Sequence, residues 1–129
     1  MTKNKILVVD DTKMYQTIYK TKLMSEGFEV KIAGNGAEAI RILSGEAFDL
    51  VLLDLTMPLM DGFKVLQAIK ENPKLSSTPV VVFSSRGQPQ EIEKAVNLGA
   101  DGYLVKSTTP PNEVVKKVRD LLGGTYKQK

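Results

Sequence analysis

The chain of 129 residues has the length of a single domain, and its 42% hydrophobic and 26% charged residues are ordinary for a globular protein. Cysteine and histidine are both absent, which excludes disulfides, thiolate chemistry, a Ser-His-Asp triad and a phosphohistidine carrier. No apolar run approaches the roughly 18 residues that span a bilayer, so we expect a cytoplasmic protein that makes no membrane contact.

Short apolar runs alternate with amphipathic stretches along the whole chain. Apolar runs of about 4–8 residues between turn signals predict buried strands, whereas longer amphipathic stretches predict helices. In chain order we predict strand 6–9, helix 12–26, strand 28–33, helix 37–44, strand 50–54, helix 63–72, strand 80–83, helix 88–98, strand 103–105 and helix 111–122. Several of these helices are followed by a residue that ends helices, namely Gly27, Gly45, Pro73 and Gly99.

Strands that alternate with helices predict an α/β fold in which a five-stranded parallel sheet is covered by helices on both faces. We expect one domain over residues 1–129, with its core at about 4–122 and a loose tail at 123–129. Ligands of such sheets bind beyond the carboxyl ends of the strands, where the strand order reverses.

Four of the predicted strands end at a charged or hydroxyl side chain. Because the carboxyl ends of parallel strands share one edge of the sheet, we expect these side chains to converge although they are far apart in sequence. They are Asp10 and Asp11 after the first strand, Asp54 after the third, Ser84 after the fourth and Lys106 after the fifth.

The convergence of three carboxylates predicts a metal site. Two carboxylates about 5 Å apart repel by roughly 3 kcal/mol at an effective dielectric constant near 20. Hard oxygen ligands suit Mg²⁺ or Mn²⁺, so we expect a metal-assisted site whose substrate carries phosphate.

Each of these residues also has a simpler explanation. An aspartate after a strand is commonly a turn or N-cap residue, which fits Asp10 and Asp11 taken alone. Lys106 fits a solvated loop lysine, and Ser84 fits a hydroxyl that satisfies a backbone group. Together, the simpler explanations require five coincidences at one edge of one sheet. For that reason we reject them jointly.

Residues 8–11, 52–62, 83–85 and 99–106 together resemble the receiver domain of bacterial response regulators. The most specific segment begins at Asp54 and reads Asp-Leu-Thr-Met-Pro-Leu-Met-Asp-Gly. The resemblance covers about residues 4–122 and implies a doubly wound, flavodoxin-like sheet with the strand order 2-1-3-4-5.

The resemblance implies a role for each site residue. Asp54 corresponds to the phosphoacceptor of the family, and Asp10 and Asp11 would hold Mg²⁺ together with Asp54 and the backbone carbonyl of Thr56. Lys106 and Ser84 would contact phosphoryl oxygens, so neither is expected to be needed for metal binding. The remaining residue, Tyr103, corresponds to an aromatic side chain that changes rotamer with phosphorylation.

The chain departs from the family pattern after Lys106. The family usually has a cis proline there, whereas this chain has Ser107. A cis bond costs about 2.5–4 kcal/mol before a residue other than proline, so we predict a trans bond and a locally different loop. Arg86, two residues after Ser84, lies where the family varies and where side chains affect the lifetime of the phosphoryl group.

The resemblance implies a phosphorylation-controlled signalling switch rather than an enzyme. Its partners would be a sensor histidine kinase or a phosphotransfer protein, and an unknown downstream protein that binds the surface formed by residues 88–122. Lysines scattered over several faces give no reason to expect direct nucleic-acid binding.

Three alternatives differ in what the whole protein does. We expect a stand-alone receiver, and the first alternatives are a receiver cut from a larger DNA-binding regulator or from a hybrid kinase. A more distant one is a Mg²⁺-dependent phosphatase with an aspartate nucleophile. That chemistry needs a second aspartate two residues after the nucleophile, where this chain has Thr56.

Overall fold

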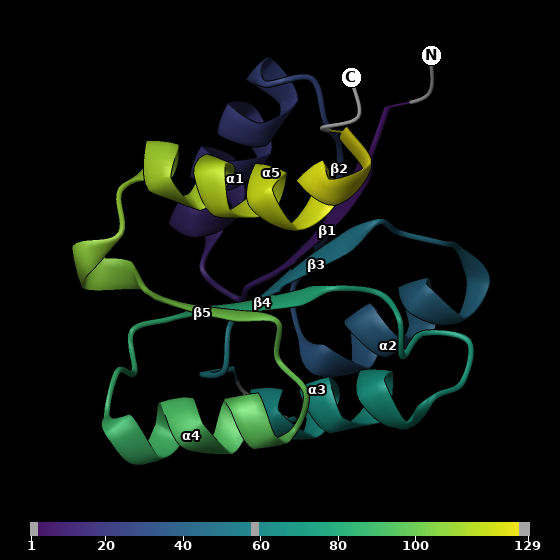
Figure 1. Ribbon diagram of the computed structural model, residues 1–129, viewed down its shortest axis with the longest axis vertical. Helices are drawn as coiled ribbons and strands as arrows, with labels where there is room; N and C mark the ends of the chain where they lie inside the picture. The colour runs from purple at the N-terminus through teal and green to yellow at the C-terminus, as the bar shows by residue number, and fades with distance from the viewer. Residues whose placement is uncertain (1–2, 58–59, 127–129) are drawn as a thin grey trace.

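The computed structural model describes residues 3–57 and 60–126, apart from the side chains of residues 124–126. Strands and helices alternate through this part of the chain (Figure 1). Their order is β1 (Lys5–Val9), α1 (Lys13–Ser25), β2 (Glu29–Ala33), α2 (Gly36–Gly45), β3 (Leu50–Leu53), α3 (Gly62–Glu71), β4 (Val80–Ser84), α4 (Pro89–Asn97), β5 (Gly102–Val105), the 3-10 turn η1 (Lys106–Thr108) and α5 (Pro111–Tyr126).

The five strands form one parallel sheet in the order β2-β1-β3-β4-β5. Helices α1 and α5 cover one face of this sheet, and α2, α3 and α4 cover the other (Figure 1). The predicted doubly wound α/β fold and its strand order are therefore confirmed.

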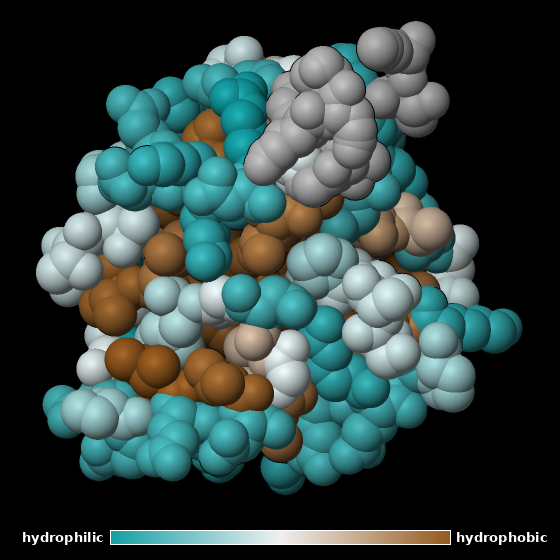
Figure 2. Space-filling view, viewed as in Figure 1, coloured by the Kyte–Doolittle hydropathy of each residue, from teal (hydrophilic) through white to brown (hydrophobic). Residues whose placement is uncertain are grey.

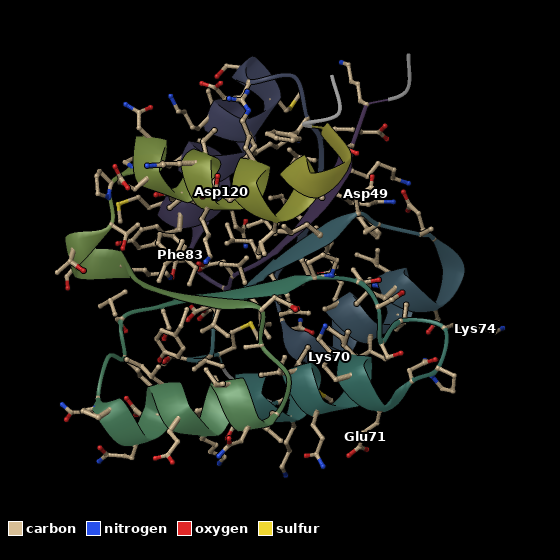
Figure 3. The ribbon with its side chains drawn as sticks, viewed as in Figure 1. Asp49, Lys70, Glu71, Lys74, Phe83 and Asp120 are labelled. Carbon is tan, nitrogen blue, oxygen red and sulfur yellow. The ribbon has the colours of Figure 1, made fainter. Side chains whose placement is uncertain are left out.

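Burial on both faces of the sheet explains why the central strands read as continuous apolar runs. In β3, Leu50 and Leu52 contact the side of the sheet that α1 and α5 cover, and Val51 and Leu53 contact the opposite side. Figure 3 shows Phe83 of β4 in the layer between the sheet and α5. A fully buried side chain of this size stabilises the fold by about 1.5–3 kcal/mol.

Local signals in the sequence set several helix ends. Gly27 has a φ of 95° and donates its N–H to the carbonyl of Met24, as expected for a left-handed residue after a helix. Asn72 is extended because the following residue is Pro73. The Asp61 carboxylate accepts a hydrogen bond from the amide of Phe63 and so begins α3.

The C-terminal end of the chain differs from the prediction. Helix α5 continues to Tyr126, so residues 123–126 are not part of a loose tail, whereas residues 127–129 lie outside the described part. Glycine weakens a helix by only about 1 kcal/mol per residue. Leu121 and Leu122 pack against the core on the α1 and α5 side, and Gly123 is buried, so packing continues the helix past the two glycines. The other element ends agree with the prediction or differ from it by one residue.

Candidate functional site

The parallel register brings the predicted strand ends together. Val9 of β1 pairs with Leu53 of β3, and the amide of Asp54 donates to the carbonyl of Val9 over 2.9 Å. Asp10 and Asp54, which follow these two strands, are therefore neighbours. The register between β4 and β5 also pairs Ser84 with Val105, the residue before Lys106.

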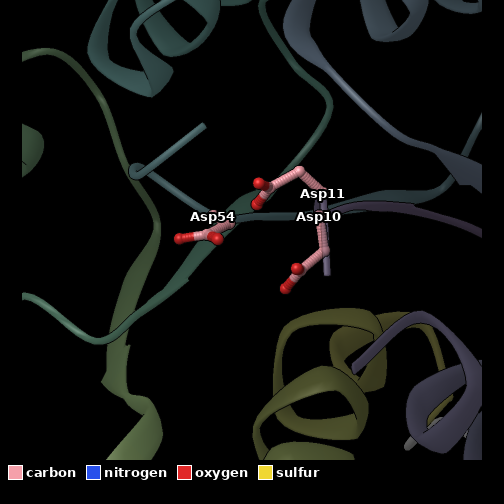
Figure 4. Close-up of side chains that lie close together, drawn as sticks. All are labelled: Asp10, Asp11 and Asp54. Atoms are coloured by element: carbon pink, nitrogen blue, oxygen red, sulfur yellow. The ribbon is translucent and has the colours of Figure 1, made fainter. Parts of the chain in front are cut away.

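Asp10, Asp11 and Asp54 form a carboxylate cluster (Figure 4). One oxygen from each residue lies within 4.8 Å of the others. Asp10 is 3% exposed and Asp54 is 4% exposed, whereas Asp11 is exposed to solvent. The predicted convergence of the three carboxylates is confirmed.

Backbone amides fix the orientation of the two buried carboxylates. The amide of Thr12 donates to Asp10 Oδ1 over 2.9 Å, and the amide of Thr56 donates to Asp54 Oδ1 over 3.1 Å. Burial raises the pKa of Asp54, and the hydrogen bond from Thr56 and the charge of Lys106 reduce that effect only in part. The negative charge of Asp54 is therefore costly in the folded protein.

Lys106 is the buried cation of the site. Its Nζ lies 2.7 Å from Asp10 Oδ2 and 3.3 Å from Asp54 Oδ2, and its side chain is 7% exposed. Burial lowers the pKa of Lys106, but the hydrogen bond to Asp10 and the charges of Asp54 and Asp10 raise it by more. Lys106 is not the solvated loop lysine of the simpler explanation.

The peptide bond between Lys106 and Ser107 is trans, because the described residues contain no cis peptide bond. This confirms the prediction made from the missing proline. Lys106 is also the first residue of η1, and both Ser107 and Thr108 are exposed. The two residues after Lys106 therefore make few packing contacts with the rest of the protein.

Ser84 and Tyr103 both contact the loop between β4 and α4. Ser84 is fully buried, and its Oγ accepts a hydrogen bond from the amide of Arg86 over 3.1 Å. Tyr103 donates its hydroxyl to the carbonyl of Arg86 over 2.7 Å. Burial raises the pKa of Tyr103, and the charge of Glu91 adds to the effect. The loop is thus held from both β4 and β5.

Thr56 lies beside the cluster. Together with Asp61 and Arg86 it lines a hollow of about 280 Å³ beyond the carboxyl end of β3. Gly62, at the start of α3, lies against the same backbone: a Cβ there would be 2.4 Å from the Cα of Leu55 and 2.6 Å from the carbonyl oxygen of Asp54. Only glycine allows α3 to begin so close to Asp54. Pro58 and Leu59 of the motif lie outside the described residues.

The donor set fits a hard divalent cation. Three carboxylates at one strand edge are typical ligands of Mg²⁺ or Mn²⁺, and a site with neither histidine nor cysteine does not favour softer metals.

Sequence reasoning missed two residues that contact the site. The ring centroid of Tyr15 lies 4.0 Å from Lys106 Nζ, and Gln16 donates its side-chain amide to the carbonyl of Asp10 over 2.7 Å. Tyr15 and Tyr19 have helical spacing and follow Asp10 and Asp11 within one short segment. This spacing was the signal in the sequence for an aromatic side chain beside the site.

Residues 6–119 match the response regulator receiver domain family. The chain belongs to this family. A solved structure of the chemotaxis protein CheY4 from Vibrio cholerae matches with a TM-score of 0.87 at 28% identity, and covers 93% of this chain and 99% of that one. A CheY-like receiver domain protein from Methanospirillum hungatei matches with a TM-score of 0.90 at 26% identity, over 99% of this chain and 100% of that one.

The receiver is also similar to longer proteins. It is 38% identical over 125 residues to a probable transcriptional regulator, ycf27, of Cyanophora paradoxa, which covers 97% of this chain and 51% of that protein. The chain spans about half the length of the curated relatives it matches. Among the described residues, no helix has the length and apolarity needed to cross a membrane.

Proposed function

We propose that this receiver accepts a phosphoryl group on Asp54 from a phosphohistidine of a sensor histidine kinase or a phosphotransfer protein. The observation that carries the proposal is the environment of Asp54: a buried carboxylate within 4.8 Å of two others and 3.3 Å from a buried ammonium group. The phosphohistidine must lie outside residues 1–129, because these contain no histidine.

The chemistry needs no general base. A carboxylate oxygen of Asp54 attacks phosphorus in line, the new O–P bond forms as the P–N bond breaks, and the imidazole nitrogen leaves with that electron pair. The amide of Thr56 restricts rotation of the attacking carboxylate through its bond to Oδ1. The product is an aspartyl phosphate.

Asp10, Asp11, Asp54 and the backbone carbonyl of Thr56 would hold Mg²⁺ or Mn²⁺. A divalent cation bound there neutralises negative charge on the phosphoryl oxygens. Lys106 donates to one of those oxygens as a point charge. The Oγ of Ser84 accepts from the amide of Arg86, which leaves its own hydroxyl proton available for another phosphoryl oxygen.

Acetyl phosphate with Mg²⁺ tests the proposal through the intact mass of the protein. Wild type should gain one phosphoryl group and Asp54→Asn none. Asp61→Asn is the matched control, because it makes the same change in charge at a helix cap where asparagine serves equally well. A phosphorylated Asp54→Asn protein, or an unmodified wild type, would disprove the assignment.

We further propose that phosphorylation is read at the surface of α4, β5 and α5. Tyr103 of β5 and the loop before α4 are joined through the Arg86 carbonyl, so a movement near Ser84 reaches both elements. Apolar side chains gather along the seam between α4 and β5 (Figure 2), and Val96 of α4 is 55% exposed. Beryllofluoride with Mg²⁺ should shift the amide NMR signals of these elements, and shifts confined to the strand ends would contradict the proposal.

Two expectations about the whole protein stay predictions. The absence of catalytic turnover is tested by measuring phosphate release from small phosphate esters, which should not exceed the slow release from the aspartyl phosphate.

Action without an attached output domain is tested by the size of the protein in an extract of its own cells. The curated relatives, named as transcriptional regulators and about twice as long, make an attached DNA-binding domain the competing possibility.

A further inference from the structure

The ammonium group of Lys106 lies over the aromatic ring of Tyr15. Lys106 Nζ lies 4.0 Å from the centroid of this ring, well within the distance of about 6 Å at which a cation is attracted to an aromatic face. Tyr15 comes from the first turn of α1, so the contact joins that helix to the turn after β5.

Two further aromatic side chains fix the ring of Tyr15. The ring of Tyr19, one helical turn later, stacks on it at 6.4 Å with an interplanar angle of 16°. Phe83 of β4 meets it edge-on at 6.0 Å and 88°. Because Tyr19 and Phe83 are themselves buried, the ring that Lys106 meets is held by the core.

Lys106 needs such a support because its other partners change during the proposed reaction. Asp10 and Asp54 are the hydrogen-bond acceptors of Nζ. Both would become metal ligands, and the carboxylate of Asp54 would become an acyl phosphate, whose negative charge lies on the phosphoryl oxygens. The exposed residues Ser107 and Thr108 offer the lysine little packing in compensation. Two aromatic rings keep their charge distribution throughout: Tyr15, at 4.0 Å from Nζ, and Phe83, at 5.7 Å, so Tyr15 is the nearer of the two.

We propose that Tyr15 is a positioning residue for Lys106, whose ring face holds the ammonium group where it meets the phosphoryl oxygen. The inference rests on the proposed function of Asp54 and Lys106. It concerns the free energy of the phosphorylated state and not metal binding, because Tyr15 has no oxygen directed at the three carboxylates in the described contacts.

Beryllofluoride, a mimic of the phosphoryl group, provides the test. Its half-saturating concentration at fixed Mg²⁺ can be measured from amide NMR signals for Tyr15→Leu and Tyr15→Phe, each in the wild-type and the Lys106→Met background. Tyr15→Leu should raise this concentration about 3- to 30-fold in the wild-type background, the range of a partly desolvated cation–π contact. Tyr15→Phe, which keeps a ring, should restore binding to within about twofold of wild type.

The Lys106→Met background separates positioning from general packing. If Tyr15 acts through the ammonium group, Tyr15→Leu should have no effect beyond about twofold once that group is gone. Met14→Leu is the matched control, since Met14 is the neighbour of Tyr15 on α1 and is 56% exposed. The Mg²⁺ affinity of the Tyr15 variants should equal that of wild type.

Equal losses in both backgrounds would overturn the inference, because the ring would then only fill space. It would also be overturned if Tyr15→Phe lost as much as Tyr15→Leu, which would point to the hydroxyl. If Tyr15→Leu does not fold, Tyr15→Met takes its place, as a flexible side chain that fills the space without a ring. A wild type that binds no beryllofluoride would instead refute the proposed function.

Discussion

Asp54→Asn should stabilise the protein when no divalent cation is present. Carboxylate oxygens of Asp10 and Asp54 lie within 4.8 Å of each other, so their repulsion is at least about 3.5 kcal/mol at an effective dielectric constant near 20. The exposed Asp11 adds less because water screens it. Lys106 at 3.3 Å offsets this with about 5 kcal/mol of attraction. The charge–charge energies thus nearly cancel, and the cost of burying the carboxylate remains.

The expected gain in the free energy of unfolding is roughly 1–3 kcal/mol, the usual cost of a poorly compensated buried polar group. For a domain of this size it corresponds to an increase in Tm of about 3–10 °C. Thermal unfolding of both proteins in buffer with a chelator measures it, with Asp61→Asn as the control for net charge. A Tm of Asp54→Asn equal to or below that of wild type would show that the charge of Asp54 is well compensated in the fold.

The pH dependence of this difference follows from the pKa of Asp54. Burial raises that pKa above its value in the unfolded chain, which is about 3.9. The folded state therefore holds its proton to higher pH than the unfolded state does. The stability that this proton provides is complete below the unfolded pKa and is lost as the pH rises through the folded pKa. The advantage of Asp54→Asn should thus be complete above the folded-state pKa of Asp54 and shrink as the pH is lowered through that raised pKa.

Three further predictions concern the metal, the lysine and the backbone beside the acceptor. Mg²⁺ at 100 times its dissociation constant should stabilise wild type by about 2.7 kcal/mol, and Asp11→Ala should abolish most of the resulting rise in Tm; an undiminished rise would locate the metal elsewhere. Lys106→Met should lower the Tm without Mg²⁺, because it leaves two buried carboxylates unpaired at a cost of about 3–5 kcal/mol. In calorimetry it should bind Mg²⁺ at least as tightly as wild type, and weaker binding would make Lys106 part of the metal site. Gly62→Ala should lose about 1–3 kcal/mol or more in chemical denaturation, because its Cβ would overlap the backbone of Leu55, whereas Gly45→Ala, with no atom within 4 Å of the added Cβ, should not.

The sequence predicted that Asp10, Asp11, Asp54 and Lys106 converge, because their convergence depends on topology. Once parallel strands are inferred from short apolar runs, the residues that follow Val9, Leu53 and Val105 must meet at one edge, whatever their distance in sequence. Helix ends were predicted for a local reason, since a residue such as Gly27 ends a helix through its own backbone preference.

What the sequence did not predict depends on packing between distant side chains. Local propensity argues against a helix through Gly123, and it is the packing of Leu121, Leu122 and Gly123 that continues α5. The spacing of Tyr15 and Tyr19 indicates an aromatic face on α1, but not that Lys106 lies above it. Nor does a convergence of charges reveal which pairs form, here Lys106 with Asp10 at 2.7 Å and with Asp54 at 3.3 Å.

These pairs give Lys106 a part in metal binding as well as in the response to phosphorylation. Without a divalent cation, the ammonium group is the cation that neutralises Asp10 and Asp54. A cation held by the same carboxylates competes with it, since both positive charges need the same oxygens. Binding of a metal would therefore weaken the interaction of Asp10 and Asp54 with Lys106, and a phosphoryl group on Asp54 would offer the lysine new oxygens. In the proposed function, charge sets the order of events: a bound metal would separate Lys106 from Asp10 and Asp54, and the ammonium group would then bind the phosphoryl oxygens.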